Sequence, residues 1–405
     1  MSRILVWSPN YAPELTGIPP LVTDACDWLA DHGHRIDVVT AVPNYPERKI
    51  HPGYRGRMWL TERRGQVDLH RTWLWARPQE RFVDKALYEL SFAALSTPAT
   101  LRQMRRADVL VCVVPCLGAA AVSALLVRAL HASGRRIPLV LWVQDLVLRA
   151  ASSLGDLSPG ARRVIGAAGA MESAVFRAAD RLVVCSPVFA HHAERLGVQP
   201  ARIETIHNWV DLDRVRAMPP REPVAPTRLL YAGNLGYTQG FGTLIDAARL
   251  VGDDIQLEIV GSGNSAAEVG RLAATTTNVR VSPPVANDDY PDLLASADVH
   301  VIVQRGISAD ANFPSKIASY LASGRPIVAS ISPDSAAASV LRESGGALVV
   351  APDAPGELAV AIRALSGRPE LRRELGVRAR AYAESHFGRD RALARLESAV
   401  VTAKR

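Results

Sequence analysis

One lysine in an arginine-rich chain stands out as a residue that could do chemistry. Of 47 basic residues only four are lysine, namely Lys49, Lys85, Lys316 and Lys404. Lys316 follows Pro314-Ser315, inside a helical pattern expected over residues 314–323. A compact ammonium at a helix start suits a phosphate or diphosphate, because the backbone N–H groups and dipole of that helix end also favour an anion. The alternative interpretation is a solvated lysine in the first helical turn.

Two carboxylates in the first half of the chain are candidates for acid–base chemistry. Asp145 comes just after the apolar run Leu139–Val143 and could orient or deprotonate a hydroxyl group. Alternatively, it caps the segment that follows. Glu14 lies in a proline-rich loop at residues 9–20, where Gly17 precedes a helical pattern and would let the backbone approach a ligand. A plain turn is the alternative for this loop.

Two glycine-rich loops each follow an expected strand. Residues 233–240 combine three glycines with small polar side chains, which is typical of an anion-binding loop. The loop lacks the Lys-Ser/Thr pair of a P-loop, so ATP hydrolysis is not expected. Gly261-Ser262-Gly263 resembles the start of a dinucleotide fingerprint. That site would need an acid about 20 residues further on, and Ser-Pro-Pro follows the next strand instead.

The elements that must position these residues follow a repeating pattern. Short apolar runs alternate with helical patterns, which indicates parallel βαβ units. The expected strands are Ile4–Ser8, Arg35–Thr40, Val67–Arg71, Val109–Val114, Leu139–Val143, Arg181–Cys185, Ile203–Ile206, Arg228–Ala232, Gln256–Val260, Val279–Val281, Val299–Val303, Ile327–Ala329 and Ala347–Val349. Helices are expected at 20–31, 83–105, 158–178, 187–196, 240–251, 264–274, 289–296, 314–323, 335–344, 355–366 and 369–385. The expected fold class is α/β, with two doubly wound Rossmann-like domains.

A proline-rich stretch marks the junction between the two domains. Residues 218–226 hold four prolines in nine positions. We assign 1–210 to an N-terminal domain, 211–226 to the linker and 227–385 to a C-terminal domain, with 386–405 expected as a helix that crosses back. Two such domains would face each other across a cleft, with ligands at the carboxyl ends of the strands.

The net charge of +7 lies entirely in the first half of the chain. Residues 1–200 hold 24 basic and 17 acidic residues, and the remaining residues hold 23 of each. The basic residues gather with tryptophans in segment 55–85, a combination that fits an anionic membrane surface or a lipid phosphate. Nucleic acid is not expected, because no recognisable binding motif accompanies the charge. An ordinary solvated face is the alternative.

Composition also limits the compartment and the cofactors. No apolar run reaches the ~20 residues of a membrane helix, and the chain begins with a strand where a signal peptide would have its apolar region. We expect a cytoplasmic protein, with peripheral attachment at the inner face of the cell membrane as an added hypothesis. The four cysteines lack metal-site spacing, and Cys112 and Cys116 are expected to be core thiols.

Taken together, these motifs resemble those of glycosyltransferase family 4, the retaining nucleotide-sugar enzymes of GT-B architecture. The resemblance spans essentially the whole chain and rests on the proline-rich loop with Gly17, Val143-Gln144-Asp145, Asn208-Trp209-Val210-Asp211, Gly233–Gly240, Val260–Gly263, Pro314-Ser315-Lys316 and Ser323–Pro326. Within the family, Gly233–Gly240 and the run from Val303 to Lys316 look most like the exopolysaccharide enzymes of the colanic-acid type.

The resemblance implies transfer of a sugar from a nucleotide diphosphate-sugar co-substrate to a hydroxyl of a lipid-linked or other glycan acceptor, in exopolysaccharide or cell-envelope glycan biosynthesis. It implies retention, with no cofactor and no metal. The first domain would bind the acceptor and the second the donor. The expected catalytic residues are Asp145, Lys316 and Glu14. The expected donor-binding residues are Gly17, Asn208, Gly233, Asn234, Gln239, Gly261, Val285, Arg305, Ser315, Lys316 and Ser319.

The chain also departs from the family pattern. Asn234 and Gln239 stand where members commonly carry Arg and Lys, and Ala311 and Ser319 stand where members carry a pair of glutamates. The donor phosphates would then depend on Lys316, the N–H groups of its helix and Arg305. Ribose recognition would be weaker, or would use the Ser319 hydroxyl. The catalytic histidine often seen in such enzymes is missing, since Val114-Pro115-Cys116 occupies its place.

Two other functions stay open from the sequence alone. The missing glutamates would also fit a non-catalytic partner protein that binds a nucleotide-sugar. An enzyme like the UDP-sugar 2-epimerases, built on the same architecture, would interconvert nucleotide-sugars without an acceptor.

Overall fold

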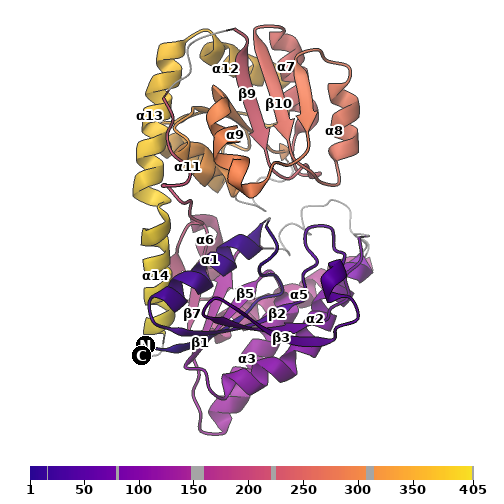
Figure 1. Ribbon diagram of the computed structural model, residues 1–405, viewed down its shortest axis with the longest axis vertical. Coiled ribbons are helices and arrows are strands. Elements are labelled where there is room, and N and C mark those ends of the chain that lie inside the picture. Colours follow the sequence, from indigo (N-terminus) through magenta and orange to yellow (C-terminus); the bar gives the residue numbers. More distant parts are fainter. Residues whose placement is uncertain (16, 79–81, 147–158, 220–224, 307–313, 404–405) are drawn as a thin grey trace. The chain divides into compact units, whose positions relative to one another are not determined.

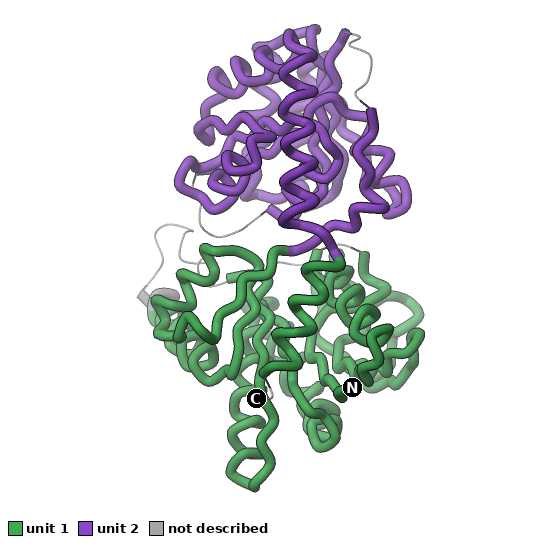
Figure 2. Tube along the Cα trace, turned by 90° about the vertical axis from the view of Figure 1, so that its left-hand side faces the viewer, with its two compact units in different colours: residues 1–207, 390–405 green, residues 208–389 purple. Residues whose placement is uncertain are grey.

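The computed structural model describes the whole chain except residues 16, 79–81, 147–158, 220–224, 307–313 and 404–405 (Figure 1). It divides into two compact units, each built around one sheet (Figure 2). Unit 1 comprises residues 1–207 and 390–405, and unit 2 comprises residues 208–389. None of the described helices is both long enough and apolar enough to cross a membrane.

Unit 1 holds an eight-stranded sheet in the order β3-β4-β2-β1-β5-β6-β7-β8. Its strands are β1 (Arg3–Trp7), β2 (Arg35–Ala41), β3 (Trp59–Arg64), β4 (Val67–Thr72), β5 (Val109–Val114), β6 (Leu139–Val143), β7 (Arg181–Val184) and β8 (Ile203–Thr205). Its helices are α1 (Ile18–Asp31), α2 (Phe82–Met104), α3 (Leu117–Ala132), α5 (Pro159–Ala178), α6 (Pro187–Arg195) and most of α14 (Arg389–Thr402), with short 3-10 turns at Pro52–Tyr54 and Pro200–Arg202. The strand order switches direction between β1 and β5.

Among the described strands, the edge strand β3 is the one that sequence patterning did not predict. It pairs antiparallel with β4, whereas the other neighbours in this sheet run parallel. Its sequence, WLTERR, has no buried residue and carries three charged side chains. Charged, exposed residues are typical of sheet edges, where they oppose pairing with another chain. An apolar run is therefore not the signal for such a strand.

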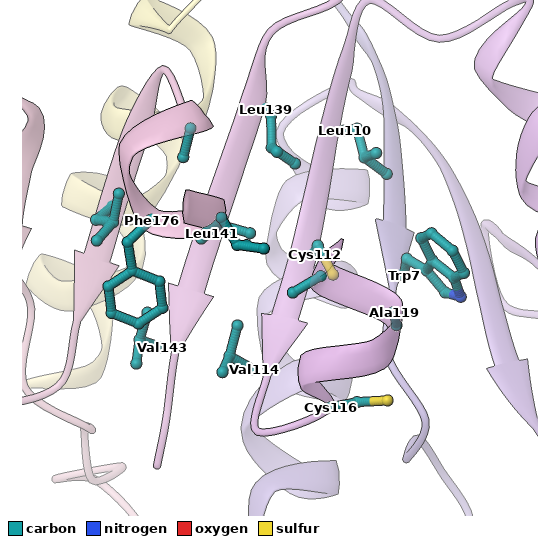
Figure 3. Close-up of a cluster of buried hydrophobic side chains, with 14 of the residues drawn as sticks. Trp7, Leu110, Cys112, Val114, Cys116, Ala119, Leu139, Leu141, Val143 and Phe176 are labelled. Atoms are coloured by element: carbon teal, nitrogen blue, oxygen red, sulfur yellow. The ribbon is translucent and has the colours of Figure 1, made fainter. Parts of the chain in front are cut away.

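The core of unit 1 gathers the central strands and three cysteines, Cys112, Cys116 and Cys185. Trp7 is fully buried, and its indole N–H donates to the Ser96 hydroxyl at 2.9 Å. Figure 3 shows Cys112 and Cys116 among the buried side chains of β5 and the start of α3. Both are free, buried thiols, which confirms the expectation of core cysteines.

Unit 2 holds a parallel six-stranded sheet in the order β11-β10-β9-β12-β13-β14. Its strands are β9 (Thr227–Ala232), β10 (Ile255–Val260), β11 (Val279–Ser282), β12 (Val299–Val303), β13 (Ile327–Ser330) and β14 (Ala347–Val350). Its helices are α7 (Phe241–Val251), α8 (Ala266–Ala273), α9 (Tyr290–Ser296), α10 (Lys316–Ala322), α11 (Ala336–Ser344), α12 (Pro355–Ser366) and α13 (Pro369–His386), with a 3-10 turn at Asn287–Asp289. This is the doubly wound order, with its switch point between β9 and β12.

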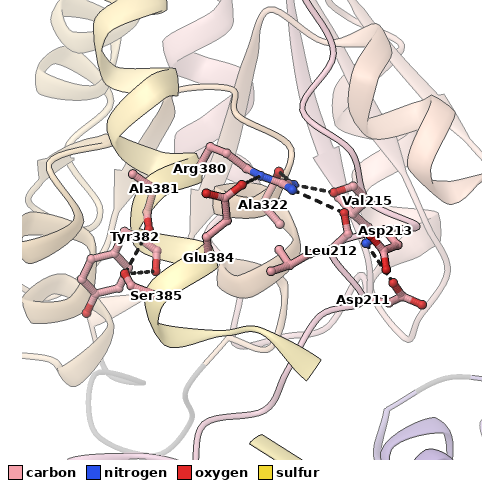
Figure 4. Close-up of polar contacts among 10 residues, drawn as sticks. All are labelled: Asp211, Leu212, Asp213, Val215, Ala322, Arg380, Ala381, Tyr382, Glu384 and Ser385. Atoms are coloured by element: carbon pink, nitrogen blue, oxygen red, sulfur yellow. Dashed lines mark hydrogen bonds and ion pairs between the residues drawn. The ribbon is translucent and has the colours of Figure 1, made fainter. Parts of the chain in front are cut away.

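Part of the segment expected as linker is held firmly to unit 2. Arg380 on α13 donates to the carbonyl oxygens of Val215 and Ala322, each at 2.7 Å, and of Leu212 at 3.3 Å (Figure 4). Glu384, one helical turn on, pairs with the same guanidinium at 2.6 Å. Residues 220–224 of the expected linker lie outside the described residues.

Candidate active site

The switch point of unit 2 brings two loops into direct backbone contact. The loop after β9 begins at Gly233, whose N–H donates to Val260 O at 2.9 Å. Leu235 N–H donates to Ser262 O at 2.8 Å, and Leu235 O accepts from Ser265 N–H at 2.9 Å. The loops after β9 and β10 therefore pack directly against each other at the carboxyl ends of their strands.

This contact explains why Gly261 and Gly263 are glycines. A Cβ at Gly261 would lie 1.9 Å from the carbonyl oxygen of Gly233, and one at Gly263 would lie 2.4 Å from that of Leu235. Gly263 also has a φ of +154°, which side-chain-bearing residues rarely adopt. The apparent start of a dinucleotide fingerprint is thus a requirement of loop packing, in agreement with the sequence argument against such a site.

The Lys316 side chain extends towards these two packed loops. Its Nζ is buried and lies 3.4 Å from the centroid of the Tyr231 ring, while a Cβ at Gly233 would lie 3.1 Å from it. Among the residues that the structure describes, Nζ has no hydrogen-bond partner. Burial lowers the pKa of Lys316 well below its usual value, because removal from water disfavours the charged form. The alternative of a solvated lysine is wrong, since a solvated ammonium would be exposed.

Three tyrosines that the sequence argument missed surround this lysine and its helix. Tyr231 lies beneath the ammonium. The Tyr320 hydroxyl accepts from Ala232 N–H at 2.7 Å and therefore holds the end of β9 in place. The Tyr290 hydroxyl lies 3.2 Å from the Ser319 hydroxyl. These tyrosines come from β9, α10 and α9, so no local spacing could have grouped them.

Arg305, after β12, is joined to the glycine-rich loop after β9. Its backbone N–H donates to Thr238 O at 2.9 Å, and its guanidinium lies 4.4 Å from the centroid of the Tyr237 ring. Within the loop, Gln239 Oε1 accepts from Gly236 N–H at 2.9 Å. Gln239 therefore closes the loop on itself.

The predicted donor-binding residues divide by where the structure places them. The loops after β9, β10 and β12 and the start of α10 bring together Gly233, Asn234, Gln239, Gly261, Arg305, Lys316 and Ser319. Ser315 and Val285 are exposed. Asn208 begins unit 2, and its Oδ1 is buried without a hydrogen-bond partner in the described part of the chain. Ala311 lies outside the described residues, and Gly17 belongs to unit 1.

Asp145 lies at the carboxyl end of β6 in unit 1, near the switch point between β1 and β5. Its Oδ1 accepts from the N–H of Leu146 at 2.8 Å, and burial raises its pKa to about 6. The neighbouring Gln144 donates its backbone N–H to Val114 O at 2.9 Å. Its side-chain amide is buried, and both amide atoms lack a hydrogen-bond partner within the described chain. A carboxyl with a raised pKa beside an unpaired amide is a candidate binding site for a hydroxyl-bearing ligand.

Glu14 has a different environment from Asp145. Its Oε1 accepts from the N–H groups of Asn44 at 2.7 Å and Tyr45 at 2.8 Å, and Oε2 accepts from Asn10 Nδ2 at 3.0 Å. Burial raises the pKa of Glu14, and these hydrogen bonds oppose the shift. Glu14 thereby positions two loops at the carboxyl edge of the sheet. A catalytic role for it stays a prediction.

Gly17 lies in the same loop and has a φ of +80°. The Tyr45 ring would be 3.5 Å from a Cβ at this position. The positive φ favours glycine at the start of α1. Approach of a ligand to this backbone stays a prediction.

Comparisons with known proteins show the family of this chain. A model described as a glycosyl transferase 4-like domain matches residues 16–209, and one described as glycosyl transferases group 1 matches residues 226–367. A protein of Escherichia coli strain K12, named as a colanic acid biosynthesis glycosyl transferase, WcaI, is 31% identical over 337 residues, which cover 80% of this chain and 81% of that protein. The chain belongs to glycosyltransferase family 4. This confirms the family that its motifs indicated.

Solved structures confirm that this glycosyltransferase has the GT-B fold. HepE from Anabaena, in complex with UDP-glucose, has a TM-score of 0.69 at 15% identity, covering 99% of this chain and 100% of that one. WaaG, a glycosyltransferase involved in lipopolysaccharide biosynthesis, has a TM-score of 0.66 at 16% identity, covering 98% and 99%. Both matches extend over essentially the whole chain, so they include the sheets of both units.

Proposed function

We propose that this glycosyltransferase moves a sugar from a nucleotide diphosphate-sugar to a hydroxyl of a glycan acceptor, with retention of configuration and without a metal ion. The buried Lys316 ammonium carries this proposal. Its Nζ has no hydrogen-bond partner among the described residues, and an anion beside it would favour the charged form that burial disfavours. At a switch point lined by glycine-rich loops, a diphosphate is the anion that fits. One lysine and fixed N–H groups can neutralise the leaving group, so the reaction does not require a metal.

The chemistry requires charge to be stabilised on the departing diphosphate. As the bond between the anomeric carbon and the phosphate oxygen breaks, negative charge grows on the phosphate that faces Lys316. The acceptor oxygen attacks from the same face, and its proton passes to the departing phosphate oxygen. Asp145 orients the acceptor hydroxyl by accepting its hydrogen bond, and the ionised carboxylate accepts that bond more strongly than the protonated acid. Attack on the face of departure gives retention.

The first experiment is a thermal-shift screen of UDP-, GDP-, dTDP- and ADP-sugars on the full chain. A ligand that binds only the folded state stabilises it by RT ln(1+[L]/Kd), about 2.7 kcal/mol at a hundredfold excess over Kd. Because the similar structure of HepE is a complex with UDP-glucose, UDP-sugars are the first to be screened. We expect one class of nucleotide-sugar to raise Tm. The absence of any shift across the panel would contradict the donor assignment.

A non-catalytic nucleotide-sugar-binding protein is the second candidate, because Ser319 stands where the family has a carboxylate. Donor binding without transfer across a broad panel of acceptors would favour this function. When transfer occurs, the anomeric configuration of the product, read by proton NMR, tests retention. Addition of a chelator tests metal independence.

The paired hydroxyls of Tyr290 and Ser319 are expected to recognise the donor ribose. We predict that the double variant Tyr290→Phe/Ser319→Ala weakens nucleotide binding about thirtyfold, since each of the two lost hydrogen bonds is worth about 1 kcal/mol. Calorimetric titration with the nucleotide measures this, and kcat at saturating donor should change little. Tyr382→Phe is the matched control, because that hydroxyl bonds to Glu343 on another face of unit 2. Equal affinity in the double variant and the control would contradict the assignment.

Asp145→Asn is expected to slow transfer at least about tenfold, since a hydrogen bond to a charged group is worth about 1.5–3 kcal/mol. In the wild type, the rate should fall as the pH drops below about 6, where Asp145 becomes protonated. The variant should lack this limb of the pH profile. A wild-type profile in the variant would assign the titration to another group.

The same substitution is expected to stabilise the protein at high pH. Burial raises the folded-state pKa of Asp145 from 3.8 to about 6. Ionisation of Asp145 therefore begins to destabilise the fold above pH 3.8, and the effect is complete above about pH 6. Asp145→Asn should increase the free energy of unfolding at pH 8 by up to about 3 kcal/mol. This gain should shrink as the pH falls through about 6 towards 3.8. Urea unfolding at several pH values measures it, with the exposed Asp246→Asn as the control.

A further inference from the structure

Gln144 has a backbone that is fully hydrogen-bonded and a side chain that is not. Its N–H donates to Val114 O at 2.9 Å, and its carbonyl oxygen accepts from the Cys185 thiol, with Sγ 3.8 Å away. The residue is 8% exposed, and neither side-chain amide atom has a hydrogen-bond partner within the described chain. Among the described residues, Gln144 is the one whose buried side chain leaves two polar atoms without a partner. Such a group requires an explanation, because burial of unpaired polar atoms lowers stability.

Packing of the core does not explain the amide of Gln144. The strand before it, β6, consists of buried apolar residues, and Val143 belongs to the same buried cluster as Phe176 (Figure 3). A methionine would fill a similar space without polar atoms that need partners. The glutamine therefore lowers the stability of the free protein. Residues that lower stability in this way are retained where function needs them.

Gln144 and Asp145 approach the end of β6 from two sides. The bond from Gln144 N–H to β5 continues the strand pairing beyond Val143, so the chain is still extended there. Successive side chains of an extended chain point to opposite faces of the sheet. Asp145 Oδ1 accepts from Leu146 N–H, and Oδ2 has no partner among the described residues. A ligand above the carboxyl end of β6 can therefore meet a carboxylate oxygen on one side and an amide on the other.

The hydrogen-bonding capacity of the Gln144 amide limits the class of ligand that it can bind. An amide donates through Nε2 and accepts through Oε1. A phosphate or a carboxylate offers only acceptors, so it would leave Oε1 buried and unpaired. Two hydroxyls on adjacent carbons of a sugar ring offer an acceptor and a donor side by side. The amide therefore fits a neutral diol better than an anion.

We propose that Gln144 determines specificity for the acceptor, a sugar ring with free hydroxyls on two adjacent carbons besides the hydroxyl that reacts. This inference rests on the proposed transfer of a sugar to a glycan acceptor. Nε2 donates to one of the two hydroxyls and Oε1 accepts from the other, while Asp145 holds the reacting hydroxyl. A site built to bond substrate hydroxyls rejects analogues that lack them, because its buried polar groups are then left unpaired.

The variant Gln144→Met tests whether the amide is free to bind a ligand. We expect Tm without ligands to rise by about 2–4 °C, because the unpaired polar atoms are removed and the space stays filled. Gln199→Met, at an exposed glutamine of the same unit, is the matched control and should keep the wild-type Tm. An unchanged or lower Tm in Gln144→Met would show that the amide is already paired in solution, by an ordered water or by the chain, and would overturn the proposal.

Acceptor kinetics test what the amide recognises. The probes are octyl β-glycosides of glucose, galactose and mannose, used with the donor that the thermal-shift screen selects. The glycoside with the fastest transfer is then compared with analogues that lack each of its other ring hydroxyls in turn. In the wild type, loss of either of two adjacent hydroxyls should lower kcat/KM at least about tenfold, and in Gln144→Met less than about twofold. Gln199→Met should discriminate like the wild type.

The remaining outcomes separate this inference from the proposed function. Equal discrimination by Gln144→Met and the wild type would overturn the inference, as would a wild type that neither uses nor binds any of the three glycosides in saturation-transfer NMR. Lys316 and its glycine-rich loops lie in unit 2, so Gln144→Met should keep the wild-type Tm shift with the nucleotide-sugar. A wild type that binds no nucleotide-sugar would contradict the proposed function itself. Donor binding and transfer without any preference among the deoxy analogues would remove only the role of Gln144.

Discussion

Replacing Lys316 by alanine is expected to lower the rate of sugar transfer by about two orders of magnitude or more. The loss of one fixed donor to a developing negative charge typically costs about 2.7–4 kcal/mol of barrier. The effect should be at the upper end here, because the family carboxylates and the usual Arg and Lys of the glycine-rich loop are absent. Lys316 would then provide a larger share of donor recognition than its counterparts do.

The measurement is the initial rate at saturating acceptor, with the donor that the thermal-shift screen selects. Lys316→Met should be equally impaired, because it fills the same space beside Tyr231 without a charge. Lys316→Arg should not restore activity, since the larger guanidinium would meet Gly233, where a Cβ would already be 3.1 Å from Nζ. Lys49→Ala, at an exposed lysine, is the control. Near-normal turnover in a folded Lys316→Ala protein would remove the lysine from the mechanism.

The type and place of Lys316 could be predicted from the sequence, but its burial could not. Its rarity and its position before an expected helix are local features of the chain. Burial depends on Tyr231 and on the approach of Gly233, and these residues lie more than 80 positions earlier in the sequence. Only the pairing of β9 with β10 and β12 brings them to the lysine.

The fold could be predicted because buried parallel strands are nearly continuous apolar runs. Such runs mark β5 and β6, whose residues are all buried. The edge strand β3 carries the opposite signal, because its exposed charges resemble those of a loop. The role of Glu14 could not be predicted for a related reason. Its hydrogen-bond donors, Asn44 and Tyr45, follow a different strand.

Gly261→Ala is expected to destabilise unit 2 by more than about 4 kcal/mol and to abolish donor binding. The new Cβ would lie 1.9 Å from the carbonyl oxygen of Gly233. Both groups are backbone, so no side-chain rotation can relieve the overlap. Either β9 and β10 separate at their carboxyl ends, or the loop that begins at Gly233 moves away from Lys316. In both cases the lysine loses the glycine-rich loop that faces it.

Chemical denaturation and the thermal shift with donor measure the two parts of this effect. Gly270→Ala, in α8 directly after the loop, is the matched control, because nothing lies within 4 Å of its added Cβ. Alanine in a helix interior should stabilise the protein by about 0.5–1 kcal/mol relative to glycine. The same chemical change should therefore have opposite signs at positions nine residues apart. Wild-type stability and donor binding in Gly261→Ala would show that the two loops do not need their close contact, and would contradict the proposed donor site.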